Sequence, residues 1–342
     1  MKILLNCPLP FALAHGGQAI QMQQTTAALE ANGVQVEPVR WWDAGQSADL
    51  IHYFGRMPAQ HIQFAHQKGM KVIIGELLTG AGSRTRAQLR LQKMISRAVA
   101  RLAPGNLAAA FNWQSYRLAD AVIAMTPWEK HLMHYLFDAP QEKIVIVPNG
   151  VEEIFLTAPK AERGPWLVCT ATIAPRKRVL ELAQAAVTAQ TPLWIIGRAY
   201  AESDPYAQQF FALAHKHPQL ICTDSPPMDD RAGLAKIYRA ARGFVLLSTK
   251  ETRSLAAEEA AACECPLLLS DLPWARSTFE QRACYCPLTP SVATTARVLR
   301  QFYDDAPTLP LPPKPPTWHE IGRQLKGIYG QVLAGKVPGQ QP

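Results

Sequence analysis

Carboxylates are concentrated in the stretch KETRSLAAEEAAACECPLLLS, residues 250–270. Glu251 follows an apolar run that predicts a buried strand, and Glu258 and Glu259 fall in a run of small residues that predicts a helix. Ligands of open α/β sheets bind at the carboxyl ends of the strands. A carboxylate at such a place can accept hydrogen bonds from two hydroxyl groups at once. The stretch therefore predicts a ligand that carries hydroxyl groups.

The start of the same helix predicts an anion site. Ser254 has the side chain of a helix N-cap, which makes Leu255 the first helical residue. The free backbone N–H groups there lie at the positive end of the helix dipole and favour phosphate groups. A diphosphate bound at this point would leave a ribose diol near Glu259 and a sugar hydroxyl within reach of Glu251.

The elements that must position these groups alternate between strand-like and helix-like segments. Apolar runs separated by helical patterns are typical of parallel sheets with crossover helices. The pattern stops near residues 157–164 and then begins again, so the sequence predicts two Rossmann-like α/β domains that face each other. The expected strands are residues 2–6, 34–39, 50–54, 70–75, 121–125, 143–147, 165–170, 192–196, 220–222, 244–247 and 266–269.

A proline-rich segment precedes the last predicted helix. Six prolines in residues 306–317 predict an extended connector. Trp318 to Leu333 then has helical spacing, with Ile321, Leu325, Ile328 and Val332 on one face. We expect domains at residues 1–156 and 157–316, and a terminal segment, 317–342, whose helix crosses back to the first domain.

The composition is that of a globular protein, with 342 residues, 48% hydrophobic and 18% charged. No run approaches the roughly 18 apolar residues that a membrane-spanning helix needs. The beginning, MKILLNCPLPF, lacks the features of a signal peptide, so we expect a cytoplasmic protein. The formal net charge of +8 predicts an anionic partner.

The seven cysteines are scattered through apolar runs, which favours free thiols over a disulfide framework. The pairs Cys263/Cys265 and Cys284/Cys286 leave a zinc site as an alternative. However, one intervening residue is not the usual ligand spacing, and no histidine lies near either pair. We therefore expect buried thiols and no metal.

An ordered set of motifs resembles the retaining glycosyltransferases of the GT-B fold, family 4. Glu251 and Glu259 match the E-x7-E motif of that family, and Lys177 falls in a matching basic turn, PRKRV. Spacing of two glutamates alone is a weak signal, whereas the ordered set covers nearly the whole chain. The other matches are Gly16 and Gly17 after the first strand, residues 119–124 and 147–151, and Trp318.

The resemblance implies a hexosyltransferase that moves a sugar from a nucleotide-sugar donor to an acceptor without a metal or another cofactor. The first domain would bind the acceptor and the second the donor. Glu251 would contact the donor sugar and Glu259 the ribose. Lys177 would neutralise the diphosphate. Further donor contacts would come from Ser254, Leu255, Arg176, Gly16 and Gly17.

The sequence departs from the family pattern at several positions. Thr172 stands where the family has an arginine, Glu76 where it has a histidine, and Glu264 where it has a glycine. These departures leave two alternatives, namely a degenerate nucleotide-sugar-binding or scaffold protein, and another GT-B enzyme such as a nucleotide-sugar epimerase. Candidates for the second cation of the donor site are Arg176, Arg178 and Arg198.

Residues 83–102 form a basic helical segment without an acidic residue. Five cations share one stripe, and Leu91, Ile95, Ala98 and Leu102 form an apolar stripe beside it. One interpretation is a helix lying on an anionic membrane, at the inner face, where a lipid-linked or cell-envelope glycan acceptor is met. The other is a helix whose apolar side packs on the core. Nucleic acid is not expected, because the segment lacks interleaved aromatic residues. The five cations are Arg86, Arg90, Lys93, Arg97 and Arg101.

Overall fold

The structure, a computed structural model, describes residues 1–8, 17–102, 113–227 and 229–339. The chain forms two compact units. We call Met1–Gly150 with Pro316–Pro342 the N-terminal unit, and Val151–Pro315 the C-terminal unit. The boundary expected after residue 156 lies after residue 150, because the fully buried Phe155 packs in the core of the C-terminal unit.

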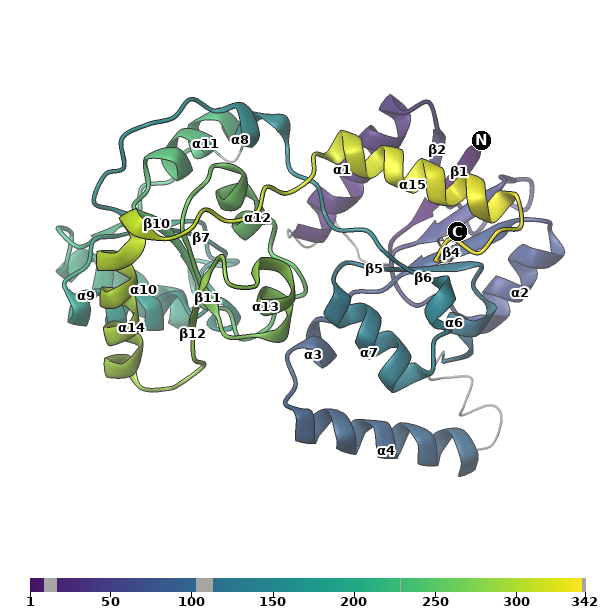
Figure 1. The fold of residues 1–342 in the computed structure, drawn as a ribbon, viewed down its shortest axis with the longest axis horizontal. Coiled ribbons are helices and arrows are strands. Elements are labelled where there is room, and N and C mark those ends of the chain that lie inside the picture. Colours follow the sequence, from purple (N-terminus) through teal and green to yellow (C-terminus); the bar gives the residue numbers. More distant parts are fainter. Residues whose placement is uncertain (9–16, 103–112, 228, 340–342) are drawn as a thin grey trace. The chain divides into compact units, whose positions relative to one another are not determined.

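The N-terminal unit contains a parallel sheet of six strands in the order β2-β1-β3-β4-β5-β6 (Figure 1). Strand β1 pairs with β2 on one side and β3 on the other, so the direction of chain progression reverses at β1. Both faces of the sheet are covered by helices, which is why its inner strands β1, β4 and β5 contain runs of buried apolar residues. The strands are β1 (Lys2–Asn6), β2 (Gln35–Pro38), β3 (Leu50–Tyr53), β4 (Lys71–Gly75), β5 (Ala121–Ala124) and β6 (Ile144–Ile146).

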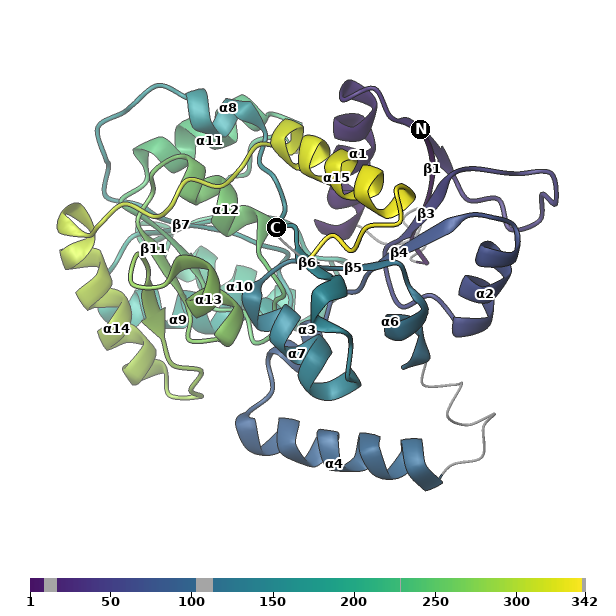
Figure 2. The ribbon, with the colours of Figure 1, turned by 45° about the vertical axis from the view of Figure 1, so that its right-hand side comes forward.

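Helices α1 and α15 lie on one face of this sheet, and α2, α6 and α7 lie on the other (Figure 1). Thr126 caps α7, with Oγ1 accepting the N–H of Glu129 at 3.1 Å. Helix α4 lies outside this layer, against α7, in both Figure 1 and Figure 2. The bounds are α1 (Gly17–Ala31), α2 (Ala59–Gln67), α3 (Thr79–Gly82), α4 (Arg86–Leu102), α6 (Gln114–Leu118), α7 (Pro127–Phe137), η1 (Gln141–Lys143) and α15 (Trp318–Leu333).

The terminal helix α15 has the bounds expected from sequence, and it crosses back to the N-terminal unit as predicted. A capping box at Thr317 and Glu320 fixes its start. It packs closely along α1, because a Cβ atom on Gly322 would lie 2.5 Å from the carbonyl oxygen of Ala28. The predicted apolar face is buried throughout, at Ile321, Leu325, Ile328 and Val332.

The C-terminal unit contains a second parallel sheet of six strands, in the order β12-β11-β10-β7-β8-β9. The chain proceeds from β7 to β8 and β9 on one side and then to β10 on the other, so β7 and β10 flank the topological switch point. Of the described strands, β12 was not predicted, because it is only three residues long and is defined by its pairing with β11. The strands are β7 (Leu167–Thr170), β8 (Leu193–Ile196), β9 (Ile221–Cys222), β10 (Gly243–Leu246), β11 (Leu267–Ser270) and β12 (Cys284–Cys286).

Helices α9, α10 and α14 cover one face of the second sheet, and α8, α11 and α12 cover the other (Figure 1). Two α/β units with parallel sheets are the fold class expected from sequence. The bounds are α8 (Glu153–Thr157), η2 (Pro175–Lys177), α9 (Val179–Ala189), α10 (Pro205–Lys216), α11 (Arg231–Ala240), α12 (Leu255–Ala262), α13 (Pro273–Phe279), α14 (Val292–Asp305) and η3 (Ala306–Thr308).

None of the seven cysteines, all of which lie in the described part of the chain, forms a disulfide, in agreement with the sequence. Burial raises the pKa of the Cys263 and Cys265 thiols to about 12, so both stay protonated. Among the described residues, no group of three or more His, Cys, Asp and Glu side chains is placed to hold a metal ion. The side chains of Cys263 and Cys265 are both fully buried.

Candidate functional site

The carboxyl ends of β7 and β10 bring two of the predicted residues together. Lys177 ends the turn η2 after β7, and Glu251 lies in the loop after β10. The N–H of Thr249 donates to the carbonyl oxygen of Arg176 at 2.8 Å, which joins the two loops. These strands flank the switch point, where open α/β sheets bind ligands. Lys177 and Glu251 therefore lie where a ligand is expected.

The buried carboxylate of Glu251 is balanced by two cations. The ammonium of Lys177 contacts Oε1 of Glu251, and Nη1 of Arg176 lies 3.2 Å from the same oxygen. Lys177 is largely buried, whereas Arg176 is about half exposed and also donates to the carbonyl oxygen of Lys250 at 3.0 Å. A bound phosphate group would compete with Glu251 for these cations, since it carries charge of the same sign.

The turn that carries Lys177 is fixed by a close approach between two loops. A Cβ atom on Gly197, which follows β8, would overlap the carbonyl oxygen of Ala171, so only glycine fits there. The N–H of Ile173 donates to the carbonyl oxygen of Arg198 at 3.0 Å. The loop between β7 and Lys177 is therefore pressed against the end of β8.

The three candidates for the second cation have different surroundings. Arg178 is buried at a backbone φ of 54°, and its guanidinium donates to the carbonyl oxygen of Thr289 at 2.6 Å. That contact gives Arg178 a structural role. Arg198 is exposed. Arg176 is the candidate that contacts Glu251, so it is the cation best placed to assist Lys177.

Helix α12 begins as expected from sequence. Ser254 is its N-cap, with Oγ accepting the N–H of Ala257 at 3.3 Å, and Leu255 is the first helical residue. The neighbouring Glu258 turns into the protein, where its carboxylate lies 2.7 Å from Nε of Arg253. Burial raises the pKa of Glu258. Its ion pair and burial fit a structural role.

Glu259 lies in the middle of α12, and its carboxylate pairs with the guanidinium of Arg231. Nε of Arg231 lies 2.7 Å from Oε1 of Glu152, and its guanidinium carbon lies 4.8 Å from the ring centre of Phe155. Arg231 and Glu152 were not predicted from sequence. One signal in the sequence could have indicated this ion pair. Arg231 is the first residue of α11, where a positive charge is unfavourable next to the positive end of the helix dipole and needs a carboxylate partner.

Burial raises the pKa of Glu259 to about 7, and the positive charge of Arg231 works against that rise. A carboxylate held this far from water needs a cation or hydroxyl donors as partners. The nearby Tyr238 hydroxyl donates to Oγ1 of Thr170 at 2.9 Å, and burial followed by the charge of Glu259 raises its pKa. Glu259 therefore changes charge near neutral pH.

In the N-terminal unit, Glu76 follows β4 at the position where the resemblance leads one to expect a histidine. Nε of Arg56 lies 2.6 Å from Oε2 of Glu76, Nη2 lies 2.9 Å from Oε1, and the Tyr116 hydroxyl contacts the same carboxylate. The guanidinium carbon of Arg56 is 4.2 Å from the ring centre of Phe137. A carboxylate in fixed orientation thus replaces the expected imidazole.

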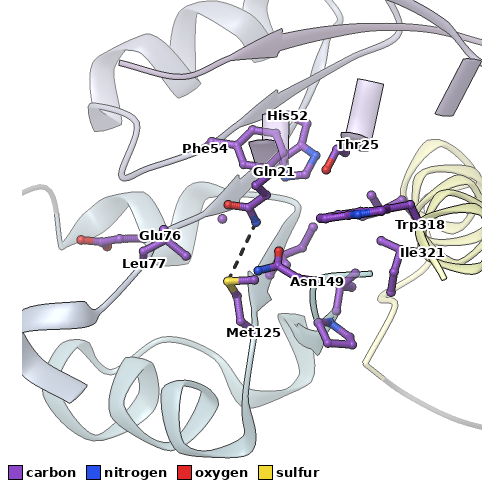
Figure 3. A pocket seen from close by; sticks show the side chains of 15 residues that line it. Gln21, Thr25, His52, Phe54, Glu76, Leu77, Met125, Asn149, Trp318 and Ile321 are labelled. Carbon is purple, nitrogen blue, oxygen red and sulfur yellow. Dashed lines mark hydrogen bonds between the residues drawn. The ribbon is translucent and has the colours of Figure 1, made fainter. Parts of the chain in front are cut away.

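A small cavity of about 30 Å³, which we call the edge cavity, lies beside Glu76 at the carboxyl edge of the first sheet. Figure 3 shows Glu76 and Trp318 at its opposite ends. His52 is bonded through Nδ1 to the Tyr329 hydroxyl at 2.7 Å, and burial lowers its pKa to about 3. Nε2 of His52 and Oδ1 of Asn149 are buried without a hydrogen-bond partner among the described residues. The edge cavity therefore suits a small polar group.

Two predicted residues precede or begin α1. Gly17 is the first residue of α1, which follows the strand β1 at the reversal point of the first sheet. Gly16 lies outside the described residues. The predicted approach of their backbone to phosphate groups therefore stays a prediction.

The apolar stripe of helix α4 is exposed rather than packed in the core. Leu89 and Ser96 are buried, whereas Leu91, Ile95 and Leu102 are 57%, 55% and 83% exposed. The interpretation in which this stripe packs on the core is therefore wrong. No helix within the described ranges is long and apolar enough to cross a membrane. We call Leu91, Met94, Ile95, Ala98 and Leu102 the apolar face of α4.

The basic stripe of α4 is narrower than predicted. The ammonium of Lys93 lies 3.8 Å from the ring centre of Tyr135 on α7, because this residue is turned toward the protein. A partly covered lysine stacked on an aromatic ring is not free to meet a surface. The four remaining cations are exposed, and we call Arg86, Arg90, Arg97 and Arg101 the basic stripe.

Comparison with known proteins finds similarity on both sequence and structure. No family model matches the chain. A curated relative, D-inositol 3-phosphate glycosyltransferase of Jonesia denitrificans, is 31% identical over 178 residues. That match covers 44% of this chain and 41% of the relative, so the chain matches less than half the relative's length.

Solved structures match over almost the whole chain. Sucrose-phosphate synthase from Thermosynechococcus elongatus has a TM-score of 0.65 and 17% identity, covering 98% of this chain and 100% of that one. Anabaena HepE in complex with UDP has a TM-score of 0.63 and 15% identity, with 97% and 96% covered. The fold of this chain is therefore that of the GT-B glycosyltransferase structures, with a six-stranded parallel sheet in each unit.

Proposed function

We propose that the chain is a retaining glycosyltransferase of the family 4 kind, which transfers a hexose from a nucleotide sugar to an acceptor. One observation carries this proposal. Two buried carboxylates, Glu251 and Glu259, lie in the loop and the helix that follow β10 at the switch point, and each pairs with a cation. The glycosyltransferase name of the partial relative and the UDP in the HepE structure support the same reading.

The donor would be held by groups of the C-terminal unit. Glu259 would accept hydrogen bonds from the ribose diol, and Arg231 would keep its carboxylate in place. The N–H groups at Ser254 and Leu255 would bind the diphosphate at the start of α12. Glu251 would accept a hydroxyl hydrogen bond from the donor sugar once the diphosphate has drawn its cations away.

The leaving group of the reaction is a diphosphate on which negative charge develops. Lys177 and Arg176, which both contact Glu251 at the switch point, would stabilise that charge electrostatically. In this scheme the basic side chains and the N–H groups at the start of α12 neutralise the charge of the diphosphate, as a metal ion does in other transferases.

The acceptor would bind in the N-terminal unit, at a membrane surface. The apolar face and the basic stripe of α4 lie side by side and exposed, which is the arrangement of a helix lying on an anionic membrane. Each arginine near such a surface contributes on the order of 1 kcal/mol to binding. We therefore propose peripheral binding at the inner face, with a lipid-linked or cell-envelope glycan as acceptor.

The purified full chain tests this function in two steps. Isothermal titration with UDP, GDP and ADP identifies the nucleotide, and the matching nucleotide sugars are then assayed for release of the nucleoside diphosphate. Release that depends on Lys177 supports a transferase. Nucleotide binding without any turnover would favour the degenerate binding protein, and conversion of the donor into an epimeric nucleotide sugar would favour an epimerase.

A further inference from the structure

A groove of about 580 Å³ runs along α4 on the side away from the basic stripe. This volume lies within the range of about 300–1,000 Å³ that is usual for small-molecule sites. One wall consists of apolar side chains of α4, and the other of two aromatic residues from the body of the unit. We call this the α4 groove, and its apolar lining is Leu91, Ile95, Val99, Trp113 and Phe137.

The outer wall of the α4 groove is continuous with the apolar face of the helix. Leu91 and Ile95 line the groove, and more than half of each side chain is exposed. Met94 lies on the same face but does not line the groove. A hydrocarbon chain can therefore pass from an apolar surface against α4 into the groove along a continuous apolar path.

The inner end of the groove adjoins the carboxyl edge of the sheet. Arg56 lines the α4 groove, and its guanidinium pairs with Glu76, which lines the edge cavity. Arg56 is therefore the residue that connects the two spaces. Arg84 adds a second positive charge to the lining, and its Nη1 donates to Oε1 of Gln92 at 2.5 Å.

The charges around the groove indicate what occupies it. The charged residues of the groove lining are Arg84 and Arg56, and residues 83–102 contain no acidic side chain, so the groove favours an anion. A second copy of this chain would bring the same basic stripe and a formal net charge of +8, which repels. An anionic molecule with a long apolar chain satisfies both the charges and the apolar walls.

We propose that the α4 groove binds the hydrocarbon chain of an anionic lipid, and that this lipid is the acceptor. The chain lies between α4 and the aromatic wall, and the anionic head group lies toward Arg84 and Arg56. An acceptor hydroxyl of the lipid then lies toward Glu76, whose carboxylate can accept its hydrogen bond. This inference rests on the proposed function and names the class of its acceptor.

The dansyl-labelled fatty acid 11-(dansylamino)undecanoic acid is a suitable probe, since it joins an anionic group to an eleven-carbon chain. Fluorescence titration of the full chain is expected to show saturable binding to one site. Ile95→Glu places a carboxylate on the groove wall, and Val99→Trp fills the groove. Each is expected to weaken binding by about tenfold or more, because the apolar contact of the chain is lost.

Met94→Glu is the matched control, because it adds the same charge to the same helix outside the groove lining. Its affinity for the probe is expected to stay within about twofold of the wild type. Binding that does not saturate, or that is equal in the wild type and both groove variants, would overturn the inference. A wild-type dimer in analytical ultracentrifugation that Met94→Glu dissociates would also overturn it, since a second copy would then cover α4.

Titration with UDP, GDP and ADP separates this inference from the proposed function. The groove variants are expected to bind nucleotide as the wild type does, because the donor residues lie in the C-terminal unit. If the wild type binds a nucleotide but does not bind the probe, the groove inference is contradicted and the proposed function is not. Saturable probe binding without nucleotide binding would support the groove and contradict the donor site.

Discussion

The buried carboxylate of Glu259 is held by Arg231, the first residue of α11, and Arg231 is held in turn by Glu152 at 2.7 Å. Burial raises the pKa of Glu259 to about 7, while Arg231 limits that rise. Below this pH the protonated form prevails, and above it the carboxylate that can accept two ribose hydroxyl groups prevails. Nucleotide affinity should therefore increase as the pH rises through 7.

Replacing Arg231 is expected to move this pH dependence upward. In Arg231→Gln the cation that lowers the pKa of Glu259 is lost. The pH at the midpoint of the increase in nucleotide affinity should therefore lie about one unit or more above that of the wild type. Calorimetric titration with the bound nucleotide between about pH 6 and 9 measures the midpoint. Arg300→Gln removes an exposed arginine paired with Asp304 on α14 and should leave the midpoint unchanged. An unchanged midpoint in Arg231→Gln would show that Arg231 does not act through Glu259.

Replacing Lys177 is expected to slow the reaction more than it weakens donor binding. Lys177→Met removes a cation beside the charge that develops on the diphosphate, so kcat should fall about 10²–10³-fold. Lys177→Arg should restore part of this loss. Steady-state kinetics with the matching nucleotide sugar provides the measurement, and Lys250→Met, in the exposed adjacent loop position, is the control. A loss confined to KM would assign Lys177 to binding alone.

Membrane binding is expected to depend on both faces of α4. The double variant Leu91→Glu/Met94→Glu and the variant Arg97→Gln should each sediment less with anionic phosphatidylglycerol vesicles at low salt. These side chains are exposed, so the free energy of unfolding should change by no more than about 0.5 kcal/mol. Wild-type protein that stays in the supernatant would contradict the membrane proposal.

Alanine substitutions at two glycines of α15 should change the free energy of unfolding in opposite directions. A Cβ atom on Gly322 meets the carbonyl oxygen of Ala28 at 2.5 Å, so Gly322→Ala should lower the free energy of unfolding by about 1–3 kcal/mol. Gly327 has no atom within 4 Å of its Cβ position, so Gly327→Ala should raise stability by up to about 1 kcal/mol. Urea unfolding of the full chain measures both. Equal effects would contradict the close packing of α15 on α1.

Local patterns in the sequence were sufficient for most of the fold. The bounds of α15 follow from its helical spacing, and most of the strands follow from apolar runs. The strand β12 was missed because it is only three residues long and is defined by its pairing with β11. Pairing between distant segments is a tertiary property that no local window contains.

The strand ends and helix starts of the sequence indicated Glu251 and the N-cap Ser254, whereas Lys177 was selected by the family resemblance. The structure places Lys177 beside Glu251. Arg231 was missed because its partner Glu259 is 28 residues away, and the spacing of α11 does not reveal that contact. The spacing of α4 predicted the apolar stripe and four of the five residues of the basic stripe. It did not show that Lys93 faces the protein, because that depends on Tyr135 of α7.

The claim that Glu259 binds the nucleotide is tested most directly by calorimetric titration of the wild type and Glu259→Gln with UDP, GDP and ADP near pH 8. Glutamine keeps the size of the side chain but accepts hydroxyl hydrogen bonds less strongly than a carboxylate. We predict that one nucleotide binds the wild type and that the variant loses about tenfold or more of that affinity. Equal affinity of both proteins for that nucleotide, or no binding of any nucleotide to the wild type, would contradict the donor site described for Glu259.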